Sequence, residues 1–433
     1  MREIYPFMII RTLCRLSIWT AAVLGTAMAD EVTDWNAILL QALNGPPAVP
    51  APLAQRPAAI VQAAVFDAVN GIEGHYTPLH VAANAPAGAS KRAAVVQAAY
   101  ATLVVLFPAQ ALKFDQARSV SLAGIASGPA AENSESIQRG IEWGQTVADA
   151  ILAWRSTDGF ANTQPPYLGS LVPGQWRPTP PAFAPGLAPQ LAQMTPWVLA
   201  SPSQFRPAGP ASLTSPQYTG DFNETKSMGS VSSTLRTADE TLYVQFWNST
   251  SPAGFFDPVA TSLSSERHMT ISENARLLAL LNISLADAVI GCWDAKYTYS
   301  SWRPITAIQL AGTDGNADTA ADPAWTPLIV TPPFPEYPSA HSCVSGAATA
   351  VLSNVFGANT SFSVSSAGLP GVVRYFSSFS AAIEEIKNAR VLGGIHFRTA
   401  CNDGQTLGTA IGGYILDHAL LPADGQRTGQ LGR

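Results

Sequence analysis

Three short polar clusters between residues 293 and 396 place the strongest constraint on how this chain can fold. The first contains Lys296 and Arg303-Pro304, the second is Pro338-Ser339-Ala340-His341, and the third contains Arg390 and His396. Arginine does not give up its proton, and lysine adds a compact positive charge. Such cations repel one another when they are buried together without an anion. We therefore expect the fold to bring the clusters together around a small tetrahedral oxyanion such as phosphate or vanadate.

The middle cluster is predicted to stand at the start of a helix. A run of small residues follows it from Ser342 to Leu352 and closes near Gly357. The free backbone N–H groups and the dipole of a helix N-terminus favour an anion, so the Ser339 hydroxyl and the Ala340 N–H can both donate to its oxygens. His341 titrates near neutral pH and can serve as an acid or a base. Taken alone, a plain serine cap beside a chance histidine explains this cluster equally well.

The first cluster is predicted to follow a long apolar helix. We expect the helix that contains Leu277 to Trp293 to end near Lys296, with Arg303 on the loop after it, because a proline disfavours the helical conformation of the residue before it. Two surface cations beside aromatic residues are the ordinary alternative.

The third cluster ends in a pair of glycines. Gly393-Gly394 can bend or end the helix that carries Arg390, so that His396 can reach the site that the arginine faces. A histidine nitrogen can bond to phosphorus or coordinate a metal oxyanion. Alone, the cluster more often represents a solvated arginine and a buried core histidine.

In order and spacing, the three clusters together resemble the vanadium-dependent haloperoxidases and the type 2 phosphatidic acid phosphatases, which share one kind of site. Trp293 and Phe334 resemble the aromatic positions that flank vanadate in the chloroperoxidase branch. The resemblance implies a helical-bundle fold and vanadate as the cofactor, with phosphate competing for the same site. It also implies hydrogen peroxide, a halide and a small organic acceptor as the reaction partners.

The resemblance implies a role for each residue of the clusters. His396 is the axial ligand to vanadium. His341 bonds the apical oxygen and assists deprotonation of peroxide, and Lys296 polarises the peroxide toward attack by the halide. The groups expected to bind the equatorial oxygens are the side chains of Lys296, Arg303, Ser339 and Arg390 and the N–H of Ala340.

The sequence departs from the family pattern at three positions. Ala340 stands where glycine is usual, Ala389 stands where serine is common, and Ala400 stands where an aspartate four residues after the ligand histidine is typical. A ligand histidine is normally fixed by a partner on its second nitrogen. The sequence does not identify that partner for His396, since Asp403 lies seven residues after it.

The rest of the chain reads as all-α, because apolar residues recur at helical spacing and strand-like alternation is scarce. A proline-rich stretch between Asn162 and Pro216 is predicted to be a long irregular connection that wraps the surface or roofs the pocket. We expect a helical N-terminal half over residues 30–225 and a catalytic half over 226–433. The predicted helices cover residues 58–70, 91–107, 132–154, 237–247, 273–293, 342–352, 381–392 and 406–420.

The first 29 residues have the form of a cleavable secretory signal. Arginines precede an apolar run from Leu16 to Leu24, and Ala27-Met28-Ala29 is a small-x-small cleavage site. The run is shorter than the ~20 residues that span a membrane, and we expect no later segment to be apolar enough to span one. We therefore expect a secreted or periplasmic protein without a stable membrane anchor. A net charge of −6 argues against nucleic acid as a partner, and an oligomer is possible.

Two other functions fit the same residues. In an acid phosphatase, His396 would attack phosphorus to give a phosphohistidine and His341 would protonate the leaving oxygen. A non-catalytic oxyanion-binding relative would suit the alanines at 340 and 400.

Four further polar residues and the cysteines allow more limited predictions. Asp67 and Asn70 are interpreted as inter-helix hydrogen-bonding groups. Asp239 is either a buried counter-charge for Arg303 or Arg390, or part of an acidic first helical turn with Glu240 after Thr237. One disulfide is possible among the three cysteines that follow the signal, Cys292, Cys343 and Cys401.

Overall fold

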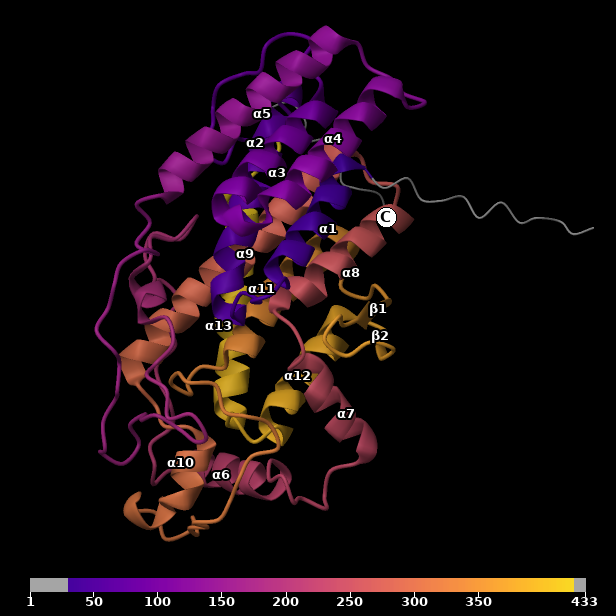
Figure 1. Cartoon of the computed structure of the whole chain (residues 1–433). Coiled ribbons are helices and arrows are strands. Elements are labelled where there is room, and N and C mark those ends of the chain that lie inside the picture. Colours follow the sequence, from indigo (N-terminus) through magenta and orange to yellow (C-terminus); the bar gives the residue numbers. More distant parts are fainter. Residues whose placement is uncertain (1–29, 424–433) are drawn as a thin grey trace, which may run out of the picture.

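The computed structural model describes residues 30–423, so the predicted signal peptide of residues 1–29 lies outside the described part. That part contains 13 α-helices and one small two-stranded sheet, joined by long irregular segments (Figure 1). The predicted all-α class is confirmed. In chain order the helices are α1 (Glu31–Leu43), α2 (Ala51–Glu73), α3 (Lys91–Leu106), α4 (Ala111–Ser127), α5 (Ser134–Arg155), α6 (Pro216–Met228), α7 (Ala238–Trp247), α8 (Pro252–Glu266), α9 (Ile271–Tyr299), α10 (Pro304–Gln309), α11 (Ala340–Phe356), α12 (Phe379–Leu392) and α13 (Arg398–His418).

Helix α9 is the central element of the molecule, and α2 packs along it (Figure 1). Thr270 caps its N-terminus in a capping box with Glu273, and all but a few of its residues are buried. Contrary to the sequence prediction, this later segment is long and apolar enough to cross a membrane, but 94% of its most apolar window is buried inside the protein. Its apolar character is therefore that of a core helix.

Helices α11 and α13 lie in close contact because α13 presents glycines at every fourth residue. A methyl group on Gly404, Gly408 or Gly412 would lie within 2.8 Å of a carbonyl oxygen of α11 or its cap. Residues four apart share one face of a helix, so these glycines form a continuous groove. Close packing here fixes the N-terminus of α11, which carries the middle cluster of the sequence.

The N-terminal helices pack against one another and against α9, and buried polar groups fix the loops between them. The carboxylate of Asp67 accepts from the backbone N–H groups of Leu79, His80 and Val81. The Asn70 amide bonds both backbone groups of Tyr76. Both residues were predicted to join helices. The structure shows instead that they hold the loop after α2.

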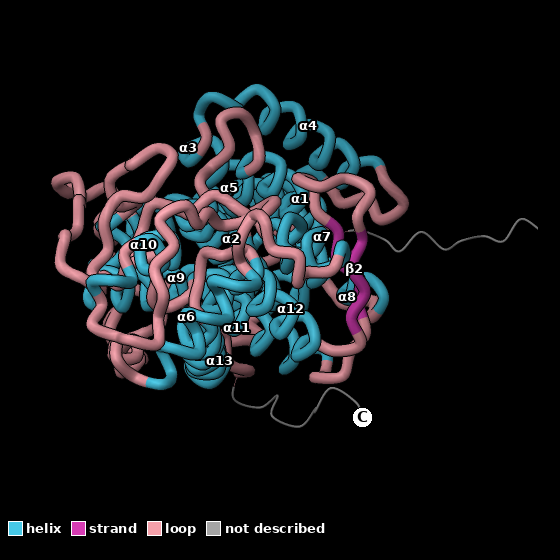
Figure 2. Tube along the Cα trace, turned by 90° about the horizontal axis from the view of Figure 1, so that it is seen from below, coloured by secondary structure: helices cyan, strands magenta, loops and turns pink. Residues whose placement is uncertain are grey.

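The proline-rich connection is irregular, as predicted, apart from a short 3₁₀ helix at Pro189–Gln193. The carboxylate of Asp287 on α9 accepts from three consecutive N–H groups of the connection, those of Trp197, Val198 and Leu199. Seen from the end occupied by α6 and α10, the loops spread over the helices (Figure 2).

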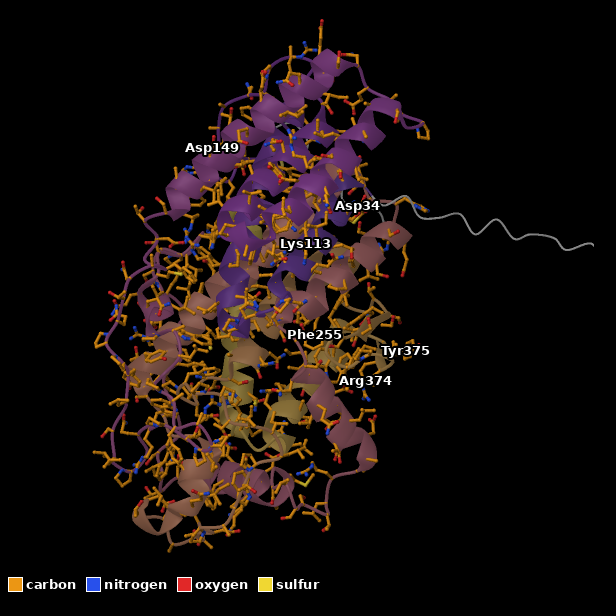
Figure 3. The ribbon with its side chains drawn as sticks, in the orientation of Figure 1. Asp34, Lys113, Asp149, Phe255, Arg374 and Tyr375 are labelled. Atoms are coloured by element: carbon orange, nitrogen blue, oxygen red, sulfur yellow. The ribbon has the colours of Figure 1, made fainter. Side chains whose placement is uncertain are left out.

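A hairpin that the sequence did not predict follows α11. Its strands are β1 (Phe362–Ser365) and β2 (Val373–Phe376), which pair antiparallel. Arg374, labelled on the hairpin in Figure 3, binds Asp239 at 2.5 Å and Glu385 at 2.5 Å. The suggestion that Asp239 offsets the charge of a site arginine is therefore wrong. The alternative is correct, because Thr237 and Glu240 form a capping box at the start of α7.

Candidate oxyanion site

The three clusters of the sequence meet at one place in the fold. Lys296 lies in the last turn of α9, Arg303 caps α10, and Arg390 lies in the last turn of α12. Ser339 caps α11, and His396 lies on the connection from α12 to α13. These five side chains are almost fully buried, whereas His341, in the first turn of α11, is half-buried. The predicted convergence of distant segments is therefore present in the structure.

The ammonium group of Lys296 is bound to the main chain on three sides. Its Nζ donates to the carbonyl oxygens of Pro335, Glu336 and Pro338 at 2.9, 3.0 and 2.5 Å. Lysine has three N–H donors, so none is left over for another ligand. The sequence predicted that helix α9 ends near Lys296. The helix continues for three more residues, to Tyr299. The extra turn holds the lysine under the loop 335–338.

Arg303 is fixed on one side of its guanidinium and free on the other. Its Nε donates to the Phe334 carbonyl at 2.8 Å, and its Nη1 donates to the Ile395 carbonyl at 2.9 Å and to Nε2 of His396 at 3.2 Å. Its buried Nη2 has no partner among the described residues. The guanidinium lies over the Phe334 ring, 4.8 Å from its centroid. The hydrogen bonds and the ring contact thus fix the guanidinium and leave the Nη2 group as its unused donor.

Arg390 is the least satisfied cation of the site. Both Nε and Nη1 are buried without a hydrogen-bond partner in the part of the chain that the structure describes. A buried guanidinium with two free donors is costly unless a ligand accepts from it. Together with Nη2 of Arg303, these donors are the arrangement that a bound oxyanion would satisfy.

The N-terminus of α11 supplies further donors, as predicted. The Ser339 oxygen accepts from the Ser342 hydroxyl at 3.1 Å, so its own proton remains free to donate. The N–H groups of Ala340 and His341 lie in the first turn and have no partner within the helix. Nε2 of His341 is buried and has no partner among the described residues.

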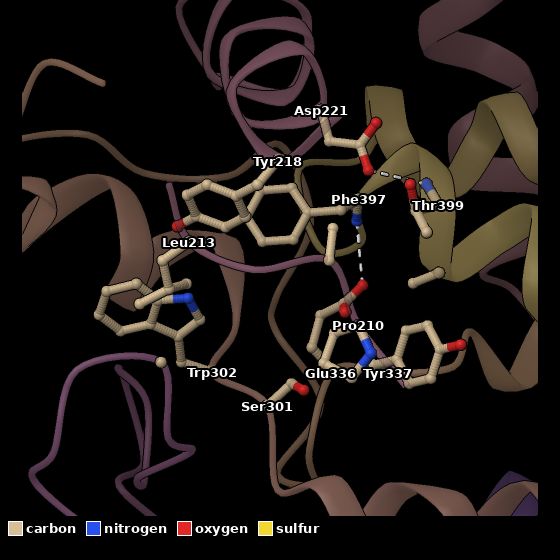
Figure 4. Close-up of a pocket in the computed structure, with 13 residues that line it drawn as sticks. Pro210, Leu213, Tyr218, Asp221, Ser301, Trp302, Glu336, Tyr337, Phe397 and Thr399 are labelled. Carbon is tan, nitrogen blue, oxygen red and sulfur yellow. Dashed lines mark hydrogen bonds between the residues drawn. The ribbon is translucent and has the colours of Figure 1, made fainter. Parts of the chain in front are cut away.

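His396 has a partner that the sequence search missed. Its Nδ1 lies 2.8 Å from Oε1 of Glu336. The same oxygen accepts the Phe397 N–H at 3.0 Å, as Figure 4 shows. Because an arginine only donates, Nε2 of His396 must be the acceptor from Arg303, so Nδ1 carries the proton and donates it to Glu336. The carboxylate thus fixes the tautomer and leaves the Nε2 lone pair toward the site.

The aspartate that the sequence offered as an alternative partner is engaged elsewhere. Asp403 accepts the Tyr337 hydroxyl at 2.6 Å. Ala400 and Glu336 both line a cavity of about 50 Å³, and Figure 4 shows Glu336 in it. The carboxylate therefore comes from the loop before α11, and it lines the same small cavity as residue 400, the position where the family pattern puts an aspartate.

Burial controls the protonation states in the site. It lowers the pKa of Lys296 to about 8, that of Arg303 to about 9 and that of Arg390 to about 10. It raises the pKa of Glu336 to about 7. Burial and the nearby cations hold the pKa values of His341 and His396 well below the usual range, so both rings are neutral at pH 7. Three cations face one carboxylate, and this surplus of positive charge suits an anion of two negative charges.

Two aromatic residues complete the site in the predicted positions. The ring centroids of Trp293 and Phe334 lie 5.1 Å apart, and the Lys296 ammonium lies 5.2 Å from the Phe334 centroid. Both rings line a cavity that also contains Ala340, His341 and Arg390. The Ala340 methyl group, a departure from the family pattern, is thus on the wall of this cavity.

All three described cysteines are buried and free. The disulfide that the sequence allowed is therefore not formed by Cys292, Cys343 and Cys401 in this structure.

Comparison with known proteins shows what the part of the chain around this site resembles. A family model described as the VCPO second helical-bundle domain matches residues 276–425, which contain all three clusters. The crystal structure titled the first bacterial vanadium-dependent iodoperoxidase is similar, with a TM-score of 0.77 and 27% identity over 90% of this chain and 97% of that chain. Residues 276–425 are thus similar to a vanadium haloperoxidase domain, and most of the chain is similar in fold to a bacterial vanadium iodoperoxidase.

Other vanadium haloperoxidases share the fold or part of the sequence. Crystal structures of bacterial vanadium-dependent chloroperoxidase in apo and holo forms have TM-scores of 0.67 and 0.65 at 15% and 16% identity, covering 84% and 90% of this chain and 92% of each of those chains. At that identity the likeness shows the fold alone. The vanadium chloroperoxidase of Curvularia inaequalis is 36% identical over 83 residues, which span 17% of this chain and 13% of the fungal protein.

Proposed function

We propose that this protein is a vanadate-dependent haloperoxidase that uses hydrogen peroxide to oxidise a halide to hypohalous acid. The observation that carries the proposal is the set of unused donors around one histidine lone pair. Nη2 of Arg303 and Nε and Nη1 of Arg390 are buried without partners in the described chain. Buried donors of this kind are rarely left unpaired in native proteins, so a ligand with several acceptor oxygens fits them.

The residues of the site fit vanadate as this ligand. His396 would hold it through Nε2, and Arg303, Arg390, Ser339 and the Ala340 N–H would bind its oxygens. When the ligand enters, Nη1 of Arg303 loses its hydrogen bond to His396. The same N–H can then donate to a ligand oxygen. Bound vanadate supplies Lewis acidity, which activates hydrogen peroxide without a change in the oxidation state of the metal.

The protein side chains would then bind, orient and move protons. His341 is neutral at pH 7, and its free Nε2 can accept a proton from incoming peroxide. Because the three Lys296 donors are occupied, we propose that the main contributions of Lys296 are its positive charge and the fixed position of the loop 335–338. Trp293 and Phe334 exclude water from one side of the site, which strengthens every electrostatic interaction within it.

The decisive experiment compares two chemistries in one preparation. The chain from Asp30 onward is incubated with orthovanadate and assayed for iodide and bromide oxidation by peroxide, and in parallel for hydrolysis of an aryl phosphate. Halide oxidation that depends on vanadate is the expected result. Hydrolysis that vanadate inhibits, without halide oxidation, would support a phosphohistidine acid phosphatase instead. Oxyanion binding with neither activity would support a non-catalytic relative.

Two histidine variants test the assignment of the ligand. We expect His396→Ala to abolish vanadate-dependent oxidation, because it removes the nitrogen that would bind the metal. His418→Ala is the matched control, since His418 lies on α13 and stacks on Tyr414 away from the site. Full activity in His396→Ala would overturn the assignment.

We also propose that the protein is exported through its N-terminal segment. The support is the arginine-flanked apolar run that ends in Ala27-Met28-Ala29. Mass spectrometry of the protein recovered from the periplasm or medium should find Asp30 at the N-terminus, and an uncleaved protein in the cytoplasm would contradict this.

A further inference from the structure

A cavity of about 220 Å³ adjoins the candidate oxyanion site and extends toward the N-terminal half. His341 and Arg390 lie where it meets the site, and Trp293 and Phe334 form one wall. The opposite wall is the first turn of α2, including Gln55. An apolar cavity of about 150 Å³ holds a benzene molecule. The space here is therefore enough for one substituted aromatic ring or a small fused pair.

Gln55 presents an unused acceptor on this wall. The residue is 1% exposed, and its Nε2 donates to the Ala51 carbonyl at 3.1 Å. A carbonyl oxygen only accepts, so the amide nitrogen must be the atom on that side, and Oε1 is the other atom. Oε1 is buried and has no partner among the described residues. Leaving such an oxygen unpaired destabilises the protein, and a donor on a ligand would remove that cost.

The rest of the lining determines what kind of ligand carries that donor. Apart from Gln55, Asn248, Thr250 and the groups at the oxyanion site, the walls are prolines, aliphatic side chains and the two aromatic rings. A cation would lose its hydration there without gaining an opposite charge, because the described residues of this lining include no carboxylate, and an anion would be drawn to Arg390 at the oxyanion site. A flat neutral ring packs well against Trp293 and Phe334. One hydrogen-bond donor at its edge would reach Gln55.

We propose that this cavity is the acceptor subsite and binds a small neutral phenol or indole, whose O–H or N–H donates to Oε1 of Gln55. The proposal deepens the proposed function and rests on it for the chemical step. Hypohalous acid formed at the oxyanion site meets a ring that is already bound. The ring π electrons form a C–X bond, the O–X bond breaks toward oxygen, and the ring proton leaves with the hydroxide as water.

Binding can be measured without any vanadate or turnover. The metal-free chain is titrated calorimetrically with 4-methylphenol and with its methyl ether, which has nearly the same shape but no donor. We expect the phenol to bind about tenfold more tightly, the value of one neutral hydrogen bond in a buried site. Equal affinity of the two probes, or no binding of the phenol, would overturn the proposal whatever the variants do.

Two glutamine variants assign the discrimination to one atom. Gln55→Leu should bind both probes with equal affinity, because it removes the acceptor and keeps the side-chain volume. Gln62→Leu is the control. Gln62 is also buried on α2 with an unpartnered Oε1, but it does not line this cavity. Its preference for the phenol should be unchanged. A preference that persists in Gln55→Leu would refute the subsite.

The outcome separates this subsite from the proposed function. Oxidation of iodide to triiodide needs no organic acceptor, so it is measured in the wild-type protein with vanadate and peroxide alone. Triiodide formation without phenol binding would leave the haloperoxidase proposal intact and reject the subsite. Phenol binding that depends on Gln55, without halide oxidation, would retain the subsite and reject the haloperoxidase proposal.

Discussion

At the scale of single residues, the pairing of His396 with Glu336 determines what the histidine can do. Both side chains are buried, and the contact holds the proton on Nδ1. A ring that was free to turn could direct either its lone pair or its N–H group toward the site. The pairing gives a fixed acceptor without adding a positive charge to a site that already contains three cations.

Removal of this carboxylate should weaken oxyanion binding. In Glu336→Ala we expect the affinity for vanadate to fall about 10- to 100-fold, the usual effect of deleting the partner of a ligand histidine. The double variant Glu336→Ala/Ala400→Asp should recover part of the loss, because residue 400 lines the same small cavity as Glu336. Calorimetric titration with vanadate measures both. Unchanged affinity in Glu336→Ala would show that the carboxylate does not position the ring.

The low pKa of Lys296 predicts how binding changes with pH. In the empty site burial lowers the pKa of this ammonium to about 8, and a bound anion favours the charged form and raises it. Binding above that pH must take up a proton, so the affinity should be flat below about pH 8 and fall up to about tenfold per pH unit above it. Titration with tungstate tests this, because tungstate keeps its charge over the range.

A conservative variant isolates the lysine. Lys296→Arg keeps the positive charge on a group of higher ordinary pKa, so its affinity should begin to fall at a higher pH than that of the wild type. A wild-type affinity that does not change with pH would mean that Lys296 is charged whether or not the anion is bound.

The site residues themselves were predictable from the sequence, but the partner of His396 was not. The spacing of the clusters that contain Lys296, Arg303, Arg390 and the two histidines matches the family pattern, so it can be recognised in the sequence alone. Glu336 reaches His396 across 60 residues, and nothing in the local pattern marks it. The occupied donors of Lys296 were also unpredictable, because they depend on the path of the backbone at residues 335–338.

At the scale of elements, the contact between α11 and α13 sets the position of the middle cluster. A Cβ on Gly408 would lie 1.8 Å from the Cys343 carbonyl oxygen, whereas one on Gly413 would meet nothing within 4 Å. Both glycines are in the same helix, so they share helix propensity and differ only in what they face.

This pair of glycines gives a matched test of helix packing. We expect Gly408→Ala to lower the free energy of unfolding by roughly 1–3 kcal/mol or more, because the helices must move apart. Gly413→Ala should raise it by about 0.4–1 kcal/mol through the unfolded chain. Urea denaturation followed by circular dichroism measures both. Equal effects of the two substitutions would indicate that α11 and α13 are less closely packed than described.

The main helices were predictable because their apolar periodicity is strong, and their ends were less so. Helix α13 begins at Arg398 rather than near residue 406, because its first turns pack through small and polar residues that weaken the apolar pattern. The hairpin after α11 was missed because its strands have only four residues each. Strands that short give too few alternations to recognise.

At the scale of the whole molecule, the proline-rich connection ties the N-terminal half to the site. The Leu187 carbonyl accepts from Trp293 Nε1 at 3.2 Å and from the Tyr297 hydroxyl at 2.7 Å. Leu187 also lines the larger cavity. The sequence suggested that this stretch either wraps the surface or roofs the pocket, and it does both because its backbone groups bond α9.

Loss of the Asp287 anchor should loosen this connection. Asp287→Ala leaves three consecutive backbone N–H groups without their acceptor, and we expect a loss of stability of about 3 kcal/mol or more. Limited proteolysis should cut the variant between residues 162 and 216 faster than the wild type. Asp34→Ala, at a partly exposed carboxylate on α1, is the control. Equal cleavage of all three proteins would show that the connection is held by its other contacts.

The surplus of positive charge around His396 affects how the protein meets its surroundings. A site of this kind attracts whichever tetrahedral ion the medium supplies in excess, and for most media that is phosphate. Vanadate then has to displace a resident competitor rather than enter an open site. The ratio of vanadium to phosphate outside the protein, more than the amount of protein made, would determine how many molecules are competent at any moment.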